Sequence, residues 1–242
     1  MKVAVISDIH GNYHALEAVL AELRSEAPDE IWCLGDVVGY GPEPNLCCAV
    51  LERHASVCLA GNHDLAVIGA IPVEDFNGDA AFAVRWTQAE LDETARSFLA
   101  PLTPAAQRES AALFHGSPID PVWDYVLSEE GARASFGAVE APLVMVGHSH
   151  VALAIAYDGE NLAGGLALDG DQIDLSGSRW LVNPGSVGQP RGGDPRASWV
   201  MLDLGAGRAS FRRTAYPIEL TQRAIRDAGL PENLAARLAL GQ

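Results

Sequence analysis

The residues with the clearest chemical potential form the segment Gly147-His148-Ser149-His150, directly after the apolar residues 143–146. An apolar run that stops at a glycine is typical of a buried strand followed by a loop. Residues two apart in extended chain lie on the same side, so His148 and His150 can face one site. Histidine serves in such places as a metal ligand or a proton carrier. A buried histidine that only satisfies a backbone carbonyl is the structural alternative.

Four more apolar runs end in polar residues of the same kind. In chain order these are Asp8 with His10, Asp36, Asn62 with His63, and His115. Only two of the seven histidines, His14 and His54, lie elsewhere. Ligands of open α/β sheets bind outside the carboxyl ends of the strands, so these side chains should meet in one crevice. This mixture of carboxylates, imidazoles and an amide does not suit a closed structural zinc site. It predicts two divalent ions that share a carboxylate.

The elements expected to position these residues change character at residue 150. Before it, strands alternate with helices; the strands are residues 3–7, 31–34, 56–60, 111–114 and 143–146, and the helices 13–24, 44–54, 76–99 and 128–137. After it, strand-like segments follow one another, which predicts antiparallel pairing of residues 151–157, 165–169, 179–182, 197–204 and 208–216. The pattern indicates two packed sheets with helices outside. We expect a single domain of residues 1–242, with a helical insertion at about 65–105 and a helical C-terminal segment at about 218–240.

Composition and charge exclude several classes of function. The formal net charge is −16, which argues against an electrostatic footprint for nucleic acid or for an anionic membrane. An acidic protein that binds phosphate needs a local source of positive charge, and metal ions can supply it. The four cysteines form no CxxC pair, which favours a reduced, cytoplasmic protein without disulfides. The sequence shows no signal peptide and no apolar segment that approaches the ~18 residues of a membrane span.

The motifs D-x-H, G-D, G-N-H-D, a lone H and G-H-x-H, in this order, resemble those of the calcineurin-like metallophosphoesterase superfamily. The segment N-P-G-S-V-G-Q-P-R at residues 183–191 is similar to its small bacterial and archaeal phosphodiesterase branch. The resemblance covers residues 3–191. It implies an α/β fold, a four-layer α/β/β/α sandwich in which two mixed β-sheets are flanked by helices. The site would lie at one edge of that sandwich.

The same resemblance implies a role for each strand-end residue. One metal ion would be held by Asp8, His10, Asp36 and His150, and the other by Asp36, Asn62, His115 and His148. Asp36 would therefore bridge the two ions. His63 is the histidine without a ligand role, and if protonated it can stabilise developing charge or give a proton to the leaving oxygen.

These roles predict a two-metal-dependent phosphoesterase that hydrolyses phosphate esters, above all small phosphodiesters, by in-line attack of a metal-bridging hydroxide. Manganese is the first expectation for the two ions. Iron, zinc, cobalt and nickel also suit mixed nitrogen and oxygen ligands. We expect a small-molecule or nucleotide-like phosphoester substrate. A chain of this size could also pair with a second copy through its strand-rich second half.

Several residues admit two interpretations. Asn12 either contacts substrate phosphate or caps the first helix. Arg191 either contacts phosphate or forms a surface salt bridge. Asp64 either orients a histidine or caps the helix that follows it. The aromatic residues either form a wall for the substrate or only pack; these are Tyr40, Trp123 and Tyr125.

Two alternative functions stay open at this point. The first is a protein phosphatase or dinucleoside polyphosphatase, but its usual G-D-x-V-D-R-G pattern has an arginine that residues 35–41 lack. The second is a non-catalytic scaffold in which metals only hold loops together, and the presence of His63 argues against it. The physiological substrate cannot be read from the motifs, because specificity lies in loops around the site.

Overall fold

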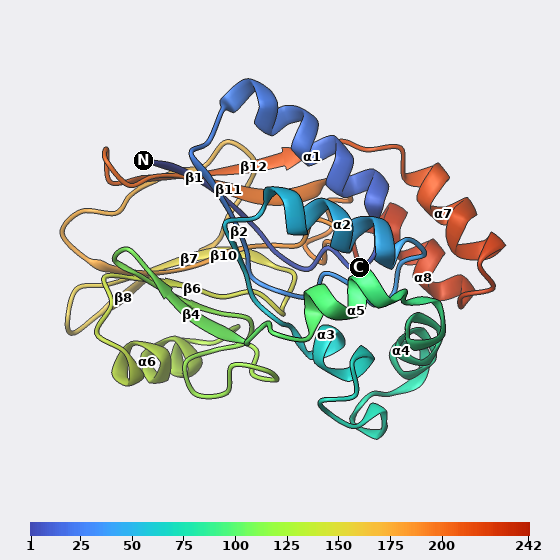
Figure 1. Cartoon of the computed structure of the whole chain (residues 1–242). Coiled ribbons are helices and arrows are strands. Elements are labelled where there is room, and N and C mark those ends of the chain that lie inside the picture. Colours follow the sequence, from blue (N-terminus) through green and yellow to red (C-terminus); the bar gives the residue numbers. More distant parts are fainter.

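The computed structural model describes residues 1–242 and contains two stacked β-sheets of six strands each (Figure 1). The first sheet has the order β3-β2-β1-β11-β12-β9, with β1 Lys2–Ile6, β2 Glu30–Cys33, β3 Val57–Cys58, β9 Gln172–Asp174, β11 Ala197–Asp203 and β12 Arg208–Thr214. The second has the order β4-β5-β6-β10-β7-β8, with β4 Ala105–Arg108, β5 Ala111–Phe114, β6 Leu143–Met145, β7 Ala152–Tyr157, β8 Leu162–Leu166 and β10 Arg179–Pro184.

Both sheets are mixed. β1, β2 and β3 run parallel, as do β5, β6 and β10. The remaining pairs are antiparallel, including β1 with β11 and β10 with β7. Antiparallel pairing after residue 150 is therefore confirmed except for β10, which also pairs in parallel with β6. The parallel strands bring their carboxyl ends to one edge of the sandwich.

Helices cover the outer faces of the two sheets, and this confirms the four-layer α/β/β/α sandwich. Helices α1 and α2 lie over the first sheet and α6 under the second (Figure 1). The helices are α1 Tyr13–Glu26, α2 Pro44–His54, α3 Asn62–Val67, α4 Gly78–Glu90, α5 Glu93–Leu99, α6 Glu129–Ala138, α7 Ile218–Asp227 and α8 Glu232–Ala236, with short 3₁₀ turns η1 Val73–Asp75 and η2 Arg237–Leu240. None of these helices combines the length and the apolar character needed to cross a membrane.

Alternation along β1 explains why both of its faces are buried. Val3 and Val5 point into the core between the sheets, whereas Ala4 and Ile6 point into the core under the helices. All four side chains are completely inaccessible to solvent. A third cluster packs α6 against the second sheet, and Phe136 lies within it. The strand that carries the first site motif is thus fixed on both sides by close packing.

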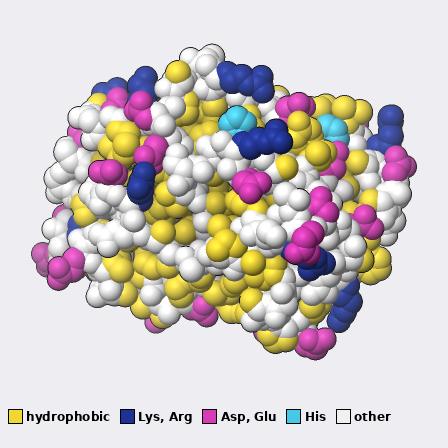
Figure 2. Space-filling view, viewed as in Figure 1, with side chains coloured by type: hydrophobic (Ala, Val, Ile, Leu, Met, Phe, Trp, Pro, Cys, Tyr) yellow, Lys and Arg dark blue, Asp and Glu magenta, His cyan; other side chains and the backbone are white.

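Some element boundaries differ from those expected. The helical stretch 76–99 is broken at Leu91 and Asp92, because Asp92 caps α5 by accepting a hydrogen bond from the Ala95 backbone N–H. Directly after the expected helical insertion at about 65–105, residues 105–108 form the edge strand β4, which was not expected. β8 begins before the expected range 165–169, and the three-residue strand β9 was not expected at all. On the face shown in Figure 2, charged side chains of both signs are scattered in small groups, without an extended basic patch.

Backbone hydrogen bonds join the two sheets at the edge where the motifs lie. The N–H of Val187 donates to the carbonyl of Ser7, and that of Gly188 donates to the carbonyl of Asp8, both at 3.0 Å. Residues 187–188 follow β10 of the second sheet, whereas Ser7 and Asp8 follow β1 of the first. A Cβ atom on Gly188 would overlap the backbone carbonyl of Ile9, so the approach of these two loops requires glycine.

We predict that Gly188→Ala lowers the free energy of unfolding by about 2 kcal/mol or more, because two backbone segments must move apart. Gly137→Ala is the matched control. Its Cβ would meet nothing within 4 Å, and alanine favours the helix α6 in which it lies. Chemical denaturation of both variants measures the difference. Equal stability of the two variants would contradict this account of the loop contact.

Candidate active site

The predicted metal ligands all lie buried at this one edge of the sandwich. None of the seven is more than 4% exposed: Asp8, His10, Asp36, Asn62, His115, His148 and His150. The donor atoms of one group lie within 4.8 Å of one another, and its members are Asp8, His10, Asp36 and His150. A second group consists of Asp36, His115 and His148. Asp36 belongs to both groups, as its predicted bridging role requires.

Donor atoms converge within each group at separations that suit a shared ion. Nε2 of His150 lies 3.4 Å from Oδ1 of Asp8, and Nε2 of His10 lies 3.5 Å from Oδ2 of Asp36. In the second group, Nε2 of His115 lies 3.6 Å from the same Asp36 oxygen and 3.2 Å from Oδ1 of Asn62. Ligand atoms about 2.1 Å from one ion lie roughly 3–3.5 Å from each other. The amide of Asn62 thus joins the second group as predicted.

Backbone carbonyls orient three of the imidazoles from behind. Nδ1 of His10 lies 3.2 Å from the Val38 carbonyl oxygen, and Nδ1 of His115 lies 2.9 Å from that of Leu34. Nδ1 of His150 lies 2.7 Å from the carbonyl oxygen of Gln189. A carbonyl accepts only from a protonated Nδ1, so the lone pair of each Nε2 faces the shared centre.

His148 is held differently. Neither of its ring nitrogens has a hydrogen-bond partner, although the ring is buried. Its ring stacks on that of Tyr125, with 4.1 Å between the centroids and 18° between the planes. Buried polar atoms rarely lack partners in a folded protein. An orphaned imidazole beside Asp36 and His115 therefore fits a residue that binds a cation.

The electrostatics of the site also fit bound cations. Burial raises the pKa of Asp8 to about 7, and burial together with Asp64 and Asp8 raises the pKa of Asp36 well above its ordinary value. Burial lowers the pKa of each imidazole in the two groups below that of free histidine. Neutral imidazole is the form that binds metal, and two divalent ions would offset the cost of ionising both carboxylates.

The backbone of the site is strained at the predicted ligands. Eight residues other than glycine have positive φ, and five of them are predicted ligands with φ between 50° and 61°: Asp8, His10, Asp36, His148 and His150. Left-handed conformation is unfavourable for residues with a Cβ, although Asp and His tolerate it better than most. Such strain persists where the surrounding structure enforces it, commonly at functional sites. Here the tight turns direct alternate side chains into one centre.

His63 lies beside the centre and belongs to neither ligand group. Its backbone N–H donates to Oδ1 of Asp36 at 2.9 Å, while its ring packs against Tyr40 and Phe76. Burial lowers the pKa of His63 to about 3, so the ring is neutral near pH 7. Transfer of a proton from His63 to a leaving oxygen would therefore require that the ring first gain that proton. Its Nδ1 is buried and has no hydrogen-bond partner.

Asp64 takes part in capping α3 and also joins two loops. Its carboxylate accepts hydrogen bonds from the N–H groups of Val37 at 3.2 Å, Val38 at 3.0 Å and Gly61 at 3.0 Å. Gly61 is the N-cap residue of α3, so the capping role is present, although Asp64 itself is the third residue of the helix. The bonds to Val37 and Val38 tie the loop after β2 to the loop after β3, which fixes Asp36 relative to Asn62.

A cleft of about 220 Å³ opens beside the ligands. Its walls include His63, four ligands and the three aromatic residues considered above, and its full lining is Asp36, Tyr40, Asn62, His63, Asp75, Phe76, Asn77, Ala80, Trp123, Tyr125, His148, His150 and Arg191. The aromatic residues thus border the space available to a ligand. Phe76, Asn77 and Ala80 also border this space, so the start of the segment 76–99 forms one side of the site.

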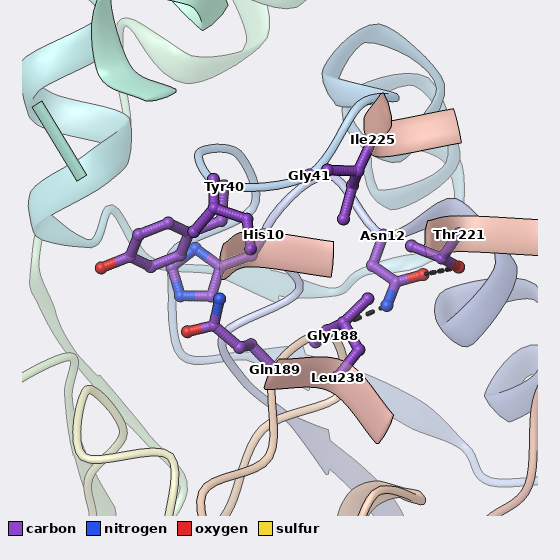
Figure 3. Close-up of a pocket in the computed structure, with 10 residues that line it drawn as sticks. His10, Asn12, Tyr40, Gly41, Gly188, Gln189, Thr221, Ile225 and Leu238 are labelled. Carbon is purple, nitrogen blue, oxygen red and sulfur yellow. Dashed lines mark hydrogen bonds between the residues drawn. The ribbon is translucent and has the colours of Figure 1, made fainter. Parts of the chain in front are cut away.

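Asn12 is a helix cap. Its Oδ1 accepts hydrogen bonds from the Ala15 N–H at 3.2 Å and from the Thr221 hydroxyl at 3.0 Å, and its Nδ2 donates to the Gly188 carbonyl at 2.9 Å (Figure 3). The substrate contact predicted for Asn12 is therefore corrected, because these bonds hold its amide inside the protein.

Arg191 is placed differently from Asn12. It lines the cleft, and its Nη2 donates to Oε1 of Gln189 at 3.1 Å. It makes no ion pair with a carboxylate, so the alternative of a surface salt bridge is wrong.

The turn at residues 183–186 supports the site from beneath. Nδ2 of Asn183 donates to the Gly147 carbonyl at 2.7 Å and to the Ser149 hydroxyl at 3.0 Å. The Ser186 hydroxyl donates to the carbonyl of Asp8 at 2.7 Å. These contacts position the D-x-H and G-H-x-H loops together.

Comparison with known proteins agrees with this geometry. The family described as the calcineurin-like phosphoesterase superfamily domain matches residues 1–207. An uncharacterized protein of Methanocaldococcus jannaschii is 34% identical over 248 residues, covering 99% of this chain and 98% of that protein. The crystal structure of a metallophosphoesterase from Sphaerobacter thermophilus superimposes with a TM-score of 0.91 and 41% identity, covering 100% of this chain and 99% of that one.

A more distant relative carries a specific activity in its name. The symmetrical bis(5'-nucleosyl)-tetraphosphatase of Erwinia tasmaniensis is 27% identical over 164 residues, which cover 60% of this chain and 56% of that enzyme. This chain therefore matches little more than half of the tetraphosphatase. Because the superfamily domain matches most of its length and full-length relatives align from end to end, the chain belongs to the calcineurin-like phosphoesterase superfamily and is a metal-dependent phosphoric ester hydrolase.

Proposed function

We propose that this enzyme uses two divalent metal ions to hydrolyse small, nucleotide-like phosphate esters, above all phosphodiesters. One observation carries the proposal: two groups of metal-ligand type share Asp36 and open into a cleft that also contains His63 and Arg191. A structural metal site would be closed by its ligands, whereas this one borders a cavity. Manganese is our first candidate for the metal.

The ligand roles follow from the two groups. Asp8, His10, Asp36 and His150 would hold one ion, and Asp36, Asn62, His115 and His148 the other. Bound there, the ions would polarise a phosphoryl oxygen, lower the pKa of a coordinated water and orient an in-line displacement. The chain contributes rigid placement, since carbonyl groups fix the imidazoles and packing fixes the strands.

His63 is the proposed catalytic residue. Its neutral ring can donate one hydrogen bond to an oxygen of the phosphate in the cleft. A bound anion favours the protonated imidazole, so substrate should raise the pKa of His63 above its value of about 3. The ring then gains the capacity to pass a proton to the leaving oxygen. Arg191, which also lines the cleft, would neutralise a phosphate oxygen.

A dinucleoside polyphosphatase is the second candidate, and the similarity to the bis(5'-nucleosyl)-tetraphosphatase favours it. Against it, residues 35–41 lack the arginine of the G-D-x-V-D-R-G pattern. A protein phosphatase meets the same objection. A scaffold without catalysis is disfavoured because His63 borders the cleft and is not needed to hold either ion.

The first test is hydrolysis of a chromogenic phosphodiester and of its monoester by metal-stripped protein supplied with each divalent metal in turn. We expect metal-dependent turnover that is highest with manganese and faster for the diester. His63→Ala should lower kcat at least about 100-fold, because proton transfer by a positioned histidine contributes that much. His54→Ala, at an exposed position on α2, is the control. Metal-dependent turnover that His63→Ala leaves intact would remove His63 from the mechanism.

The shared carboxylate predicts how ligand variants change metal content. His148→Ala removes a ligand of one group only. The variant should therefore retain about one ion per chain, where the wild-type chain binds about two. Asp36→Asn weakens both groups and should leave less than one tightly bound ion per chain. Metal analysis after desalting gives the stoichiometry. Two ions retained by His148→Ala would contradict the assignment of His148.

The raised pKa of Asp8 predicts pH-dependent metal binding. With a pKa of about 7, the carboxyl is largely protonated at pH 6 and largely ionised at pH 8. A metal ion needs the ionised form and competes with the proton, so apparent affinity should fall at least about tenfold from pH 8 to pH 6. Thermal shift during manganese titration measures this. Equal affinity at both pH values would show that protons do not compete at Asp8.

A further inference from the structure

Two arginines meet at one oxygen atom beside the cleft. Nη2 of Arg191 donates to Oε1 of Gln189 at 3.1 Å, and Nη1 of Arg237 donates to the same oxygen at 3.4 Å. Arg191 follows the loop after β10, whereas Arg237 begins η2 near the end of the chain. The two guanidinium groups therefore lie side by side although their residues are far apart in sequence.

This pair of positive charges has no carboxylate partner. Neither arginine has a carboxylate oxygen within 4.0 Å, although the chain contains 32 acidic and 16 basic side chains. Nε of Arg191 is buried and donates no hydrogen bond. Burial and the charge of Arg191 both lower the pKa of Arg237. The charge of Arg191 lowers the pKa of Asp8 and of Asp36 without forming an ion pair with either, and Asp79 raises the pKa of Arg237.

Packing of the C-terminal segment holds Arg237 in this place. Its neighbour Leu238 is buried, and it lines a small cavity together with His10, Tyr40 and Gln189 (Figure 3). The N–H of Gly193, close to Arg191, donates to the carbonyl of Gly241 at 3.0 Å. The two arginines are thus brought together before any ligand binds, which lowers the entropic cost of binding an anion.

Gln189 connects this pair to the predicted metal centre. Its carbonyl oxygen accepts the hydrogen bond from Nδ1 of His150, and its side-chain oxygen accepts from both arginines. The length of one glutamine side chain therefore separates a predicted ligand from the arginine pair. A phosphate next to the one at the metal centre could reach these guanidinium groups.

We propose that Arg191 and Arg237 form a subsite for a second phosphate group, so that the enzyme takes substrates with a chain of two or more phosphates. This rests on the proposed two-metal phosphoesterase, and it favours the second candidate substrate class, molecules with a phosphate chain, over simple phosphodiesters. A simple diester carries one negative charge, which the metal centre would neutralise alone. Two adjacent guanidinium groups match the several oxygens of a further phosphate. Arg237 also lies outside residues 1–207, the part that the superfamily domain matches.

The test compares two substrates of the manganese-loaded enzyme, diadenosine tetraphosphate and bis(p-nitrophenyl) phosphate. For Arg237→Ala, we expect kcat/KM for the tetraphosphate to fall at least about tenfold more than for the diester, mainly through KM. Loss of a hydrogen-bonded charge pair commonly has an effect of this size. Arg237→Lys should restore part of the loss. Arg223→Ala, at an exposed position on α7, should leave kcat/KM for both substrates unchanged. Equal losses for both substrates would overturn the subsite.

Calorimetry provides a readout that does not depend on turnover. Metal-loaded protein, freed of excess metal, is titrated with pyrophosphate and with orthophosphate. The wild-type chain should bind pyrophosphate more tightly, and Arg237→Ala should remove most of that preference. An unchanged preference in the variant would overturn the subsite. If no metal supports hydrolysis of any substrate, the proposed function is wrong. The preference for pyrophosphate over orthophosphate still shows in that case whether the two arginines bind a second phosphate.

Discussion

The site depends on the burial of two carboxylates that have no lysine or arginine within ion-pair distance. Asp8 and Asp36 are at most 1% exposed, and the side chains within ion-pair distance of them are neutral imidazoles. Ionising such carboxylates in the protein interior is costly unless cations or strong donors compensate. The surrounding chain supplies only part of that compensation, from two backbone N–H groups and the charge of Arg191, and burial still raises both pKa values. Divalent ions complete the electrostatics of this fold.

The need to place cations beside the two buried carboxylates also explains why the loops around them are rigid. The predicted ligands must be held close together if they are to bind ions, and the left-handed backbone conformation of five of them fits this requirement. Each such residue costs about 1–3 kcal/mol, and strain of that size persists only when the surroundings enforce it. Asp64, Asn183 and Ser186 provide the enforcement through hydrogen bonds between loops. The buried strands behind these loops provide a fixed base.

The sequence predicts the features that depend on neighbouring residues in the chain, and it misses those that depend on tertiary packing. The ligands stand at the ends of apolar runs, so Asp8 and His148 could be found from strand-end motifs alone. Strand β4 has the sequence AAQR and lies at a sheet edge, so neither apolar alternation nor β-branched residues indicate it. The neutral state of His63 depends on burial that no motif reports. Arg237 joins the site only because the C-terminal segment folds back onto residues 189–193.

The distribution of charge also constrains the size of the substrate. The chain as a whole carries a formal charge of −16, which repels large polyanions such as nucleic acid. Screening limits the reach of surface charges to about 8–10 Å in physiological salt, so a buried cationic centre dominates the field within its own cleft. A metal pair next to two unpaired arginines would be such a centre. We infer that a small molecule with several phosphates can enter a favourable field that a long nucleic acid cannot reach without crossing the acidic surface.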